Sequence, residues 1–207
     1  MKELAQAASA GLVRMAESVL VASVFGLFLR AFLLSAVIVE SRSMAPTLNP
    51  GDRVLVNRFV FSAEPSAWLA SRSPRPGDIV ELRPVDAGAP TLVKRVLAVG
   101  PATVEVRDKR LIVGGSPRDV PFAHWDDVRI YPNSPFLEDS LRYRDNLPVA
   151  DLAAGELFAL GDNRDYSFDS RMFGAVDDGR VIGRPFLRVW SASFEASTAQ
   201  RAPTLVR

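Results

Sequence analysis

The sequence predicts a mainly β fold that follows a single N-terminal transmembrane helix. The run from Ser18 to Val39 is apolar except for one charge, Arg30. As a helix this run would extend about 33 Å, which is enough to cross the hydrocarbon core of a bilayer. The chain after it consists mostly of short apolar runs bounded by Gly, Pro and Asp, which is typical of strands joined by turns.

The composition excludes several classes of protein. The chain has 207 residues, with 25 basic and 24 acidic side chains, one histidine and no cysteine. The missing cysteines exclude a disulfide scaffold, a thiol nucleophile and a zinc site built on thiolates. One histidine argues against an imidazole metal cluster. A net charge of +1 gives no basic excess of the kind that a nucleic-acid-binding protein needs.

The single charge within the apolar run decides where the membrane helix should lie. A charge at the bilayer centre costs roughly 2.5–3.5 kcal/mol. We therefore expect a helix over residues 16–32, with Arg30 reaching an interface, followed by an apolar strand over residues 33–39. The alternatives are a cleaved signal peptide and a buried core helix. No small-x-small cleavage site follows the run cleanly, which disfavours the signal peptide.

The basic residues before the run predict its orientation. Lys2 and Arg14 precede it, and the positive-inside rule counts only basic residues. This favours a cytoplasmic N-terminus and puts the chain from about Glu40 onward outside the cytoplasm.

The β-rich part is predicted to form two domains. The expected strands of the main domain include Val54–Val56, Ile79–Leu82, Leu92–Val99 and Val181–Trp190. Thr103–Val106 and Leu111–Val113 flank a short turn at Asp108–Lys109 and predict a hairpin. The segment Gly114–Asp151 has little periodicity and is either a long connection or part of a small second domain.

From these patterns we expect four regions. They are an N-terminal region with the membrane anchor (1–35), a main β-domain in two pieces (36–100 and 156–195), a smaller β-rich insertion (101–155) and a flexible tail (196–207).

Two serines directly follow the apolar run. Ser41 and Ser43 are two residues apart, so in an extended segment both side chains face the same side. Pro46 and the Asn49–Asp52 stretch then predict turns. One serine suits a nucleophile and the other a nearby hydrogen-bond donor, although a polar turn after a membrane span is also common.

Lys94 is the best candidate for a base. Only three of the 25 basic residues are lysine, and arginine cannot lose its proton in practice. Strand periodicity places Lys94 on one face with Leu92, Val96 and Ala98, and Arg95 on the other. Apolar neighbours would lower the pKa of Lys94 from about 10.4, and a base at neutral pH needs a drop of roughly 2–3 units. The alternative is an edge-strand lysine that points into solvent.

Histidine offers a second candidate base. A Ser-His-Asp triad would have to use His124, the only histidine, which lies in the irregular middle segment. A surface or packing role is the simpler interpretation of this residue.

A third polar stretch, Gly161–Arg171, alternates Asp and Arg. A calcium loop starting at Asp165 fails, because its sixth position is Ser170 instead of Gly and its twelfth is Val176 instead of Glu. A rigid loop with internal ion pairs explains the composition better. Within it, the Ser167 hydroxyl is suited to orient a neutral amine.

Taken together, these stretches resemble the bacterial type I signal peptidases, membrane-anchored serine proteases with a Ser/Lys dyad. The resemblance rests on an ordered set of motifs over about residues 20–190: the apolar run, Ser41–Leu48, Gly51–Asp52, Lys94–Arg95 and Gly161–Arg171. It implies an antiparallel β-sheet catalytic core of the signal-peptidase type with a smaller β-rich insertion domain.

The resemblance also implies a role for each site residue. Ser43 is then the nucleophile and Lys94 the general base, while Ser41 and the Ser43 backbone N–H form the oxyanion hole. Ser167 orients the lysine. The residues implied to support that loop are Arg95, Asp169 and Arg171. Those implied to line the pockets for small substrate residues at −1 and −3 are Val39, Met44 and Val93. Arg42 and Glu40 depart from the family pattern, where a small residue and a proline are common.

The implied activity is removal of N-terminal signal peptides from exported preproteins, without metal or organic cofactor. The implied partners are signal peptides, the lipid bilayer and, by proximity, the secretion translocon, but not nucleic acid. The implied location is the bacterial cytoplasmic membrane, with one span and an extracytoplasmic catalytic domain. Two alternatives stay open: a self-cleaving repressor-like Ser/Lys peptidase, and a non-catalytic membrane-anchored adaptor of an export complex.

Overall fold

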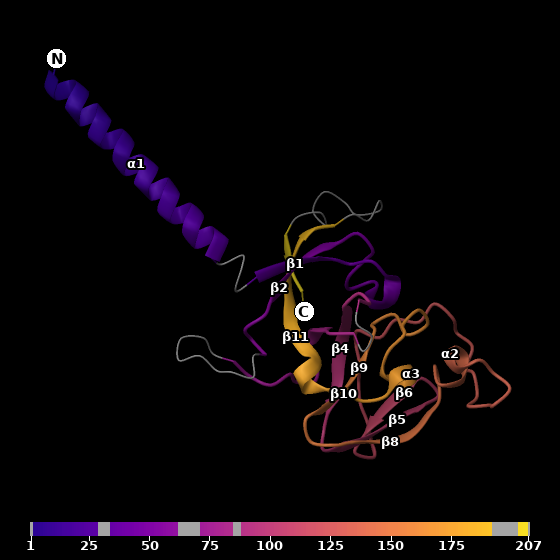
Figure 1. The fold of residues 1–207 in the computed structure, drawn as a ribbon. Coiled ribbons are helices and arrows are strands. Elements are labelled where there is room, and N and C mark those ends of the chain that lie inside the picture. Colours follow the sequence, from indigo (N-terminus) through magenta and orange to yellow (C-terminus); the bar gives the residue numbers. More distant parts are fainter. Residues whose placement is uncertain (1, 29–33, 62–70, 85–87, 192–202, 207) are drawn as a thin grey trace. The chain divides into compact units, whose positions relative to one another are not determined.

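The computed structural model describes residues 2–28, 34–61, 71–84, 88–191 and 203–206 (Figure 1). The chain divides into two compact units, residues 1–35 and 36–207. Each unit is described by itself below.

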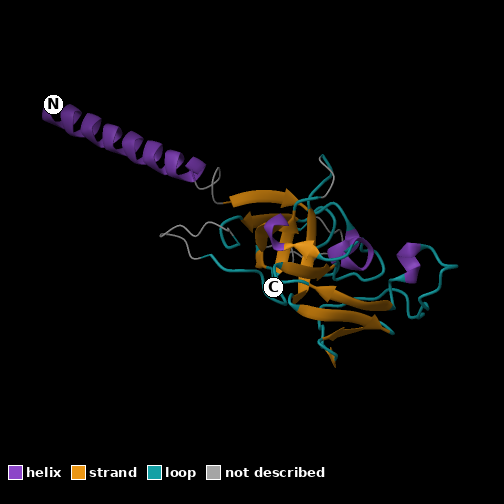
Figure 2. Ribbon diagram, turned by 60° about the horizontal axis from the view of Figure 1, so that its bottom comes forward, coloured by secondary structure: helices purple, strands orange, loops and turns teal. Residues whose placement is uncertain are grey.

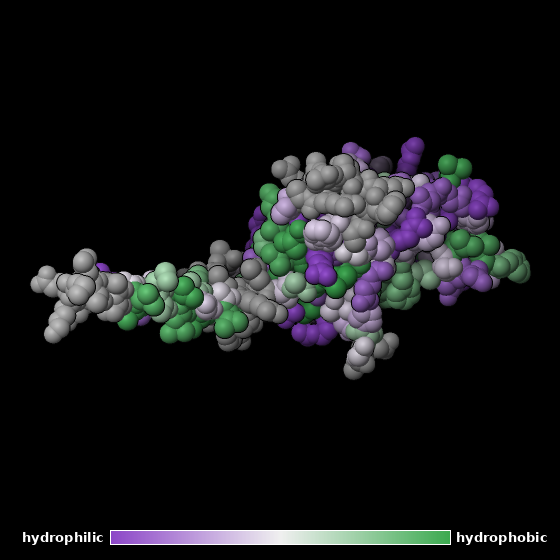
Figure 3. Space-filling view, turned by 90° about the horizontal axis from the view of Figure 1, so that it is seen from above, coloured by the Kyte–Doolittle hydropathy of each residue, from purple (hydrophilic) through white to green (hydrophobic). Residues whose placement is uncertain are grey.

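The first unit consists mainly of one long helix, α1 (Lys2–Phe28). Its hydrophobic side chains between residues 11 and 27 are exposed along its length (Figure 3). Within the described residues, no helix is both long enough and apolar enough to cross a membrane. The helix begins before the expected residue 16 and is described as far as Phe28, and Arg30 lies outside the described residues. The apolar strand expected next is confirmed as β1 (Leu34–Ile38).

The second unit is built on an eight-stranded antiparallel sheet (Figure 2). The strand order is β1-β2-β11-β3-β4-β9-β10, and β12 also pairs with β11. Its strands after β1 are β2 (Arg53–Asn57), β3 (Ile79–Leu82), β4 (Leu92–Val99), β9 (Glu156–Leu160), β10 (Val176–Asp177), β11 (Val181–Trp190) and β12 (Thr204–Leu205). The four strands predicted for the main domain are therefore confirmed. The order also leaves β1 at one end of the sheet and β4 in its interior.

β4 is an interior strand whose two faces are both buried around Lys94 and Arg95. β4 pairs with β3 on one side and with β9 on the other, so it is not an edge strand. Lys94 and Arg95 point to opposite faces, and both are buried. The edge-strand alternative for Lys94 is therefore wrong.

A bulge between Val96 and Ala98 changes the face of one predicted residue. Val96 packs in a cluster with Val80 and Leu157. Ala98 packs in a different cluster with Phe158. The prediction that Ala98 shares the face of Lys94 is wrong, because the inserted residue of a bulge breaks the two-residue period.

A second sheet of four strands has the order β7-β6-β5-β8. Its strands are β5 (Ala102–Arg107), β6 (Arg110–Val113), β7 (Ser116–Pro117) and β8 (Leu147–Leu152). The predicted hairpin is confirmed, with Val106 opposite Leu111 and a two-residue turn at Asp108–Lys109. Both turn residues have positive φ, as a tight hairpin turn of this kind requires.

The remaining elements are short. The helices are α2 (Asp139–Arg142), α3 (Ser170–Phe173) and the single turns η2 (Arg42–Met44) and η3 (Asp178–Arg180). From the region predicted as a flexible tail, β12 pairs with β11, and Val206 is buried in a cluster with Val39, Met44 and Leu48. Residues 196–202 and 207 lie outside the described residues.

Candidate active site

Ser43 lies in a turn that the chain makes immediately after β1. Two backbone hydrogen bonds fix the base of this segment, from Val39 N to Asp52 O and from Gly51 N to Val39 O. The segment then forms η2, so the prediction of an extended backbone is wrong at Arg42–Met44. The turn still brings the two hydroxyls together, with Ser41 Oγ and Ser43 Oγ 3.0 Å apart. Ser43 is buried and Ser41 is exposed at the surface.

Lys94 lies in the interior strand β4 and is only 2 % exposed. Burial lowers the pKa of Lys94 to about 8, the nearby charge of Asp169 opposes this shift, and the charge of Arg171 adds to it. The Lys94 ammonium Nζ donates a hydrogen bond of 3.1 Å to Ser167 Oγ. A lysine in this environment can lose its proton near neutral pH, which is what a general base requires.

Ser167 is held so that its oxygen faces the lysine. Its Oγ also accepts from the backbone N–H of Gly161 at 3.2 Å. Burial alone would raise the pKa of Asp169, but the ion pair to Arg171 and, to a smaller extent, a hydrogen bond from Ser167 keep that pKa below its usual range. Arg171 binds Asp169 through two nitrogens at 2.9 Å and also donates to the carbonyls of Arg144 and Arg164. The expectation that the 161–171 loop contains internal ion pairs is thereby confirmed.

Ser43 and Lys94 open into one shared groove of about 420 Å³. One wall is formed by residues 36–41, which include the end of β1, and the other by residues 90–94, which lead into β4. The predicted substrate-contacting residues Val39, Met44 and Val93 all line it, as does Ser41. Because β1 is the end strand of its sheet, an extended peptide in this groove has a backbone edge to pair with.

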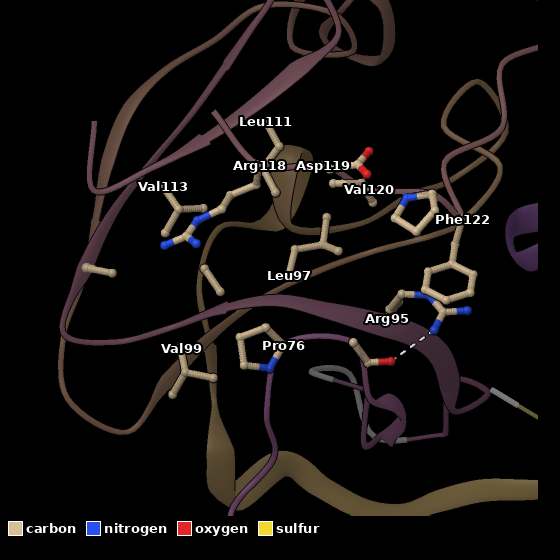
Figure 4. A pocket seen from close by; sticks show the side chains of 14 residues that line it. Pro76, Arg95, Leu97, Val99, Leu111, Val113, Arg118, Asp119, Val120 and Phe122 are labelled. Carbon is tan, nitrogen blue, oxygen red and sulfur yellow. Dashed lines mark hydrogen bonds between the residues drawn. The ribbon is translucent and has the colours of Figure 1, made fainter. Parts of the chain in front are cut away.

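The predicted support residue Arg95 lies on the opposite face of β4 from Lys94. Its guanidinium binds Asp162 through two hydrogen bonds of 2.8 Å. It also donates to the Gly77 carbonyl at 2.9 Å and lies 3.8 Å from the centre of the Phe122 ring. Figure 4 shows Arg95 beneath Phe122 at the edge of a cavity of about 590 Å³, which neither Ser43 nor Lys94 lines.

Asp162 connects this ion pair to the segment that carries Ser43. Its carboxylate accepts a hydrogen bond of 2.6 Å from Thr47 Oγ1. The next residue, Asn163, donates its backbone N–H to the Ser43 carbonyl at 3.0 Å. Asp162 and Thr47 belong to the predicted motifs, but no role is predicted for them from the sequence, because the residues that they contact lie far away in the chain.

Comparison with known proteins assigns the chain to a family. The chain matches the family described as signal peptidase, peptidase S26, over residues 12–190. The chain belongs to this family. It is therefore a serine endopeptidase of the signal peptidase I type, and the resemblance based on the motifs is confirmed.

Several relatives of the family match most of the chain. A signal peptidase I of Leptolyngbya laminosa is 31% identical over 81% of this chain and 74% of its own length. A probable signal peptidase I-1 of Synechocystis sp. is 30% identical over 84% of this chain and 80% of its own length. A crystal structure of a signal peptidase I from Enterococcus faecalis covers 55% of this chain and 97% of its own, with 26% identity and a TM-score of 0.40.

His124 is exposed and does not line the groove that contains Ser43 and Lys94. Its ring Nε2 lies 3.1 Å from Asp126 Oδ1 at the surface. Its backbone pairs with the 161–171 loop, donating to the Asp162 carbonyl and accepting from Arg164 N. The residues that line the groove with Ser43 do not include His124. The structure therefore favours the surface role over a Ser-His-Asp triad.

Gly161 is predicted to be indispensable because no side chain fits at its position. A Cβ on this residue would lie 2.3 Å from Ser167 Oγ and 2.3 Å from the Ser43 carbonyl oxygen. Gly161→Ala must therefore push the Ser43 segment away from the loop that holds Ser167. A displacement of about 1 Å can cost roughly 100-fold in rate, and we expect a loss of kcat/KM of at least about that size. Gly26→Ala is the matched control, because a Cβ there meets nothing within 4 Å. Wild-type kcat/KM in Gly161→Ala would contradict the prediction.

Proposed function

We propose that this protein removes signal peptides from exported preproteins, with Ser43 as the nucleophile and Lys94 as the general base. The observation that carries the proposal is the shared groove. It contains a hydroxyl and a buried lysine whose pKa is lowered to about 8 and whose amine is held by Ser167.

The reaction then follows from these groups. Neutral Lys94 Nζ takes the proton of Ser43 Oγ, and the oxygen attacks the scissile carbonyl carbon. The oxyanion that forms is stabilised by the Ser41 hydroxyl and the Ser43 backbone N–H. The C–N bond breaks, protonated Lys94 gives its proton to the leaving amine, and an acyl-enzyme remains. Lys94 next takes a proton from water, whose oxygen attacks the ester, so that the signal peptide leaves with a free carboxylate and Ser43 regains its proton.

The groove supports a preference for small residues at positions −1 and −3 of the substrate. Val39 and Met44 are almost fully buried, and Val93 is half-buried. These apolar side chains line the part of the groove that would hold the acyl half of the substrate. A small residue at alternate positions of an extended peptide fits such a surface, because alternate side chains face the same side.

We further propose that the N-terminal region anchors the protein in the bacterial cytoplasmic membrane by one span, with the catalytic domain on the extracytoplasmic side. The apolar character of residues 18–39 and the exposed hydrophobic side chains of α1 support an anchor. The positions of Lys2 and Arg14 support the orientation. This arrangement would bring the groove close to the lipid bilayer and to preproteins leaving the secretion translocon.

A preprotein-cleavage assay tests the proposed function. The full chain in detergent should shorten a secretory preprotein after a small-x-small motif, and Ser43→Ala should lower this activity by more than about 10⁴-fold, because the nucleophile is missing. Ser116→Ala, at an exposed serine of β7, is the matched control and should cleave like the wild type. Undiminished cleavage by Ser43→Ala would contradict the assignment of Ser43 as the nucleophile, and a wild type that cleaves no preprotein would favour the adaptor alternative.

A further inference from the structure

Arg42 has an unusual position, directly between the two serines of the active site. Its side chain is exposed, and its guanidinium lies 4.9 Å from the centre of the Tyr166 ring, a distance at which a cation is attracted to an aromatic face. Tyr166 directly precedes Ser167, which accepts from Lys94. The Arg42–Tyr166 contact therefore joins the segment of the nucleophile to the loop that holds the base.

The residues that line the groove indicate on which side of Ser43 the contact between Arg42 and Tyr166 lies. The groove is formed by residues 36–41, 43, 44 and 90–94, and neither Arg42 nor Tyr166 lines it. If the acyl half of a substrate occupies the groove and ends at Ser43, the leaving half continues on the side away from the groove. Arg42 adjoins Ser43 in the chain without lining the groove, so it is placed to meet the leaving half.

The charges around Ser43 differ between the two sides. Glu40, which is exposed, lines the groove on the acyl side. Arg42 is outside the groove and has no ion pair within 4 Å in the described part of the chain. The charge of Arg42 acts on Asp126, whose pKa is lowered mainly by hydrogen bonds from Asn163 and His124 and, to a smaller extent, by this charge. Asp126 is therefore already hydrogen-bonded to other groups, and the Arg42 charge is available to a substrate.

We propose that Arg42, held against Tyr166, is a specificity-determining residue that favours substrates with an acidic side chain within the first three positions after the scissile bond. This inference rests on the proposed function. Its physical basis is the attraction between an exposed guanidinium and a carboxylate of the leaving chain, which is modest in size and weakened by salt.

The test compares substrates that differ at one position. A preprotein is prepared with Glu, Gln or Lys at +1, +2 or +3, and kcat/KM is measured for the full-length enzyme in detergent at low and high salt. For at least one position we expect the Glu substrate to be cleaved about two- to fivefold faster than the Gln substrate, with Lys the slowest. The Glu/Gln ratio should fall toward one at high salt.

Variants then assign the preference to Arg42. Arg42→Gln should bring the Glu/Gln ratio to one, and Tyr166→Ala should lower it, while Tyr166→Phe, which keeps the ring, should retain it. Arg110→Gln, at an exposed arginine of β6, is the matched control and should keep the wild-type ratio. The Glu/Gln ratio of kcat/KM is used as the readout. A variant that only misaligns Ser43 and Lys94 lowers the cleavage of all substrates by the same factor, so this ratio stays unchanged.

Each remaining outcome overturns a different statement. Equal rates for Glu, Gln and Lys in the wild type, or an unchanged ratio in Arg42→Gln, would overturn the role of Arg42 while the proposed function stands. A wild-type enzyme that cleaves none of the substrates, including those with Gln, would overturn the proposed function itself.

Discussion

Replacing Lys94 with arginine is expected to abolish cleavage, although the variant keeps a cation at the same position. The proposed mechanism needs a base that is neutral for part of the time, and the guanidinium of arginine stays protonated at all accessible pH values. Loss of a general base typically costs roughly 10²–10⁴-fold in rate, and we expect kcat/KM to fall by at least the lower value. Lys94→Met should lose a similar factor, because it keeps an unbranched side chain but no amine.

The control for this substitution is Lys109→Arg, which makes the same change in the second sheet. Lys109 donates to the Asp127 carbonyl and lies 4.5 Å from the centre of the Trp125 ring. Arginine can retain both interactions, so the activity of this variant should stay close to that of the wild type. Comparable activity in Lys94→Arg and Lys109→Arg would contradict the assignment of Lys94 as the base.

The pH dependence of the wild type tests the same assignment without a mutation. Because burial lowers the pKa of Lys94 to about 8, the fraction of neutral amine rises with pH up to that value. We therefore expect kcat/KM to increase about tenfold per pH unit below pH 8 and to level off above it. A rate that is constant between pH 6 and pH 9 would contradict the assignment.

The stability of the protein should follow the same titration. Below pH 8 the lysine is protonated in both the folded and the unfolded state, and its burial costs about 3 kcal/mol, from a pKa difference of 10.5 against about 8. Between pH 8 and about 10.5 the unfolded chain binds more protons than the folded one, so the contribution of Lys94 to the free energy of unfolding rises with pH. Lys94→Met should remove this rise, which denaturant unfolding at pH 7 and pH 9.5 would detect.

The strands could be predicted from the sequence because their hydrophobic patterns are local. Leu92–Val99 and Val181–Trp190 are both predicted to the residue. Whether Lys94 is buried could not be predicted in the same way. That depends on what covers the face of β4 that carries Lys94, and the contacting residue Ser167 is 73 residues further along the chain.

The middle of the chain shows the limit of pattern analysis. In the stretch Gly114–Asp151, β7 has two residues, both exposed, and β8 contains Pro148 and has few buried positions. Short and mostly exposed strands produce no clear alternation of apolar and polar residues. Their pairing is instead fixed by the hairpin of β5 and β6, which supplies most of the buried side chains of the second sheet.

The residues of the candidate site could be predicted from the sequence where they belong to motifs. The contacts between residues that are distant in the sequence could not be predicted. Ser41, Ser43, Lys94 and Ser167 could all be named from the sequence. The partner of Arg95 could not, because Asp162 is 67 residues away. The hydrogen bond between Thr47 and Asp162 spans 115 residues. Neither pairing leaves a trace in a single sequence.

Removing the guanidinium of Arg95 should destabilise the protein strongly, because it leaves the carboxylate of Asp162 without its cation. Both side chains are almost completely buried, with 1% and 0% of their surface exposed. Breaking a buried ion pair by removing one partner typically costs about 3–5 kcal/mol, because an uncompensated charge remains in the interior. We expect a loss of this size in the free energy of unfolding of Arg95→Met. Arg95→Lys should recover only part of it, since an ammonium cannot reproduce two parallel hydrogen bonds and the stacking on Phe122.

Two further variants separate the isolated charge from a general loss of packing. Arg107 also forms a short ion pair, 2.6 Å from Glu105, but its side chain is 66% exposed. Arg107→Met should therefore change the stability by less than about 1 kcal/mol. Arg95→Met combined with Asp162→Asn removes both charges of this pair and should be more stable than Arg95→Met alone. A double variant as unstable as the single one would show that the lost packing of Arg95, and not the unpaired carboxylate, is responsible. Because Asp162 also accepts the hydrogen bond from Thr47, the double variant should regain stability without regaining full kcat/KM.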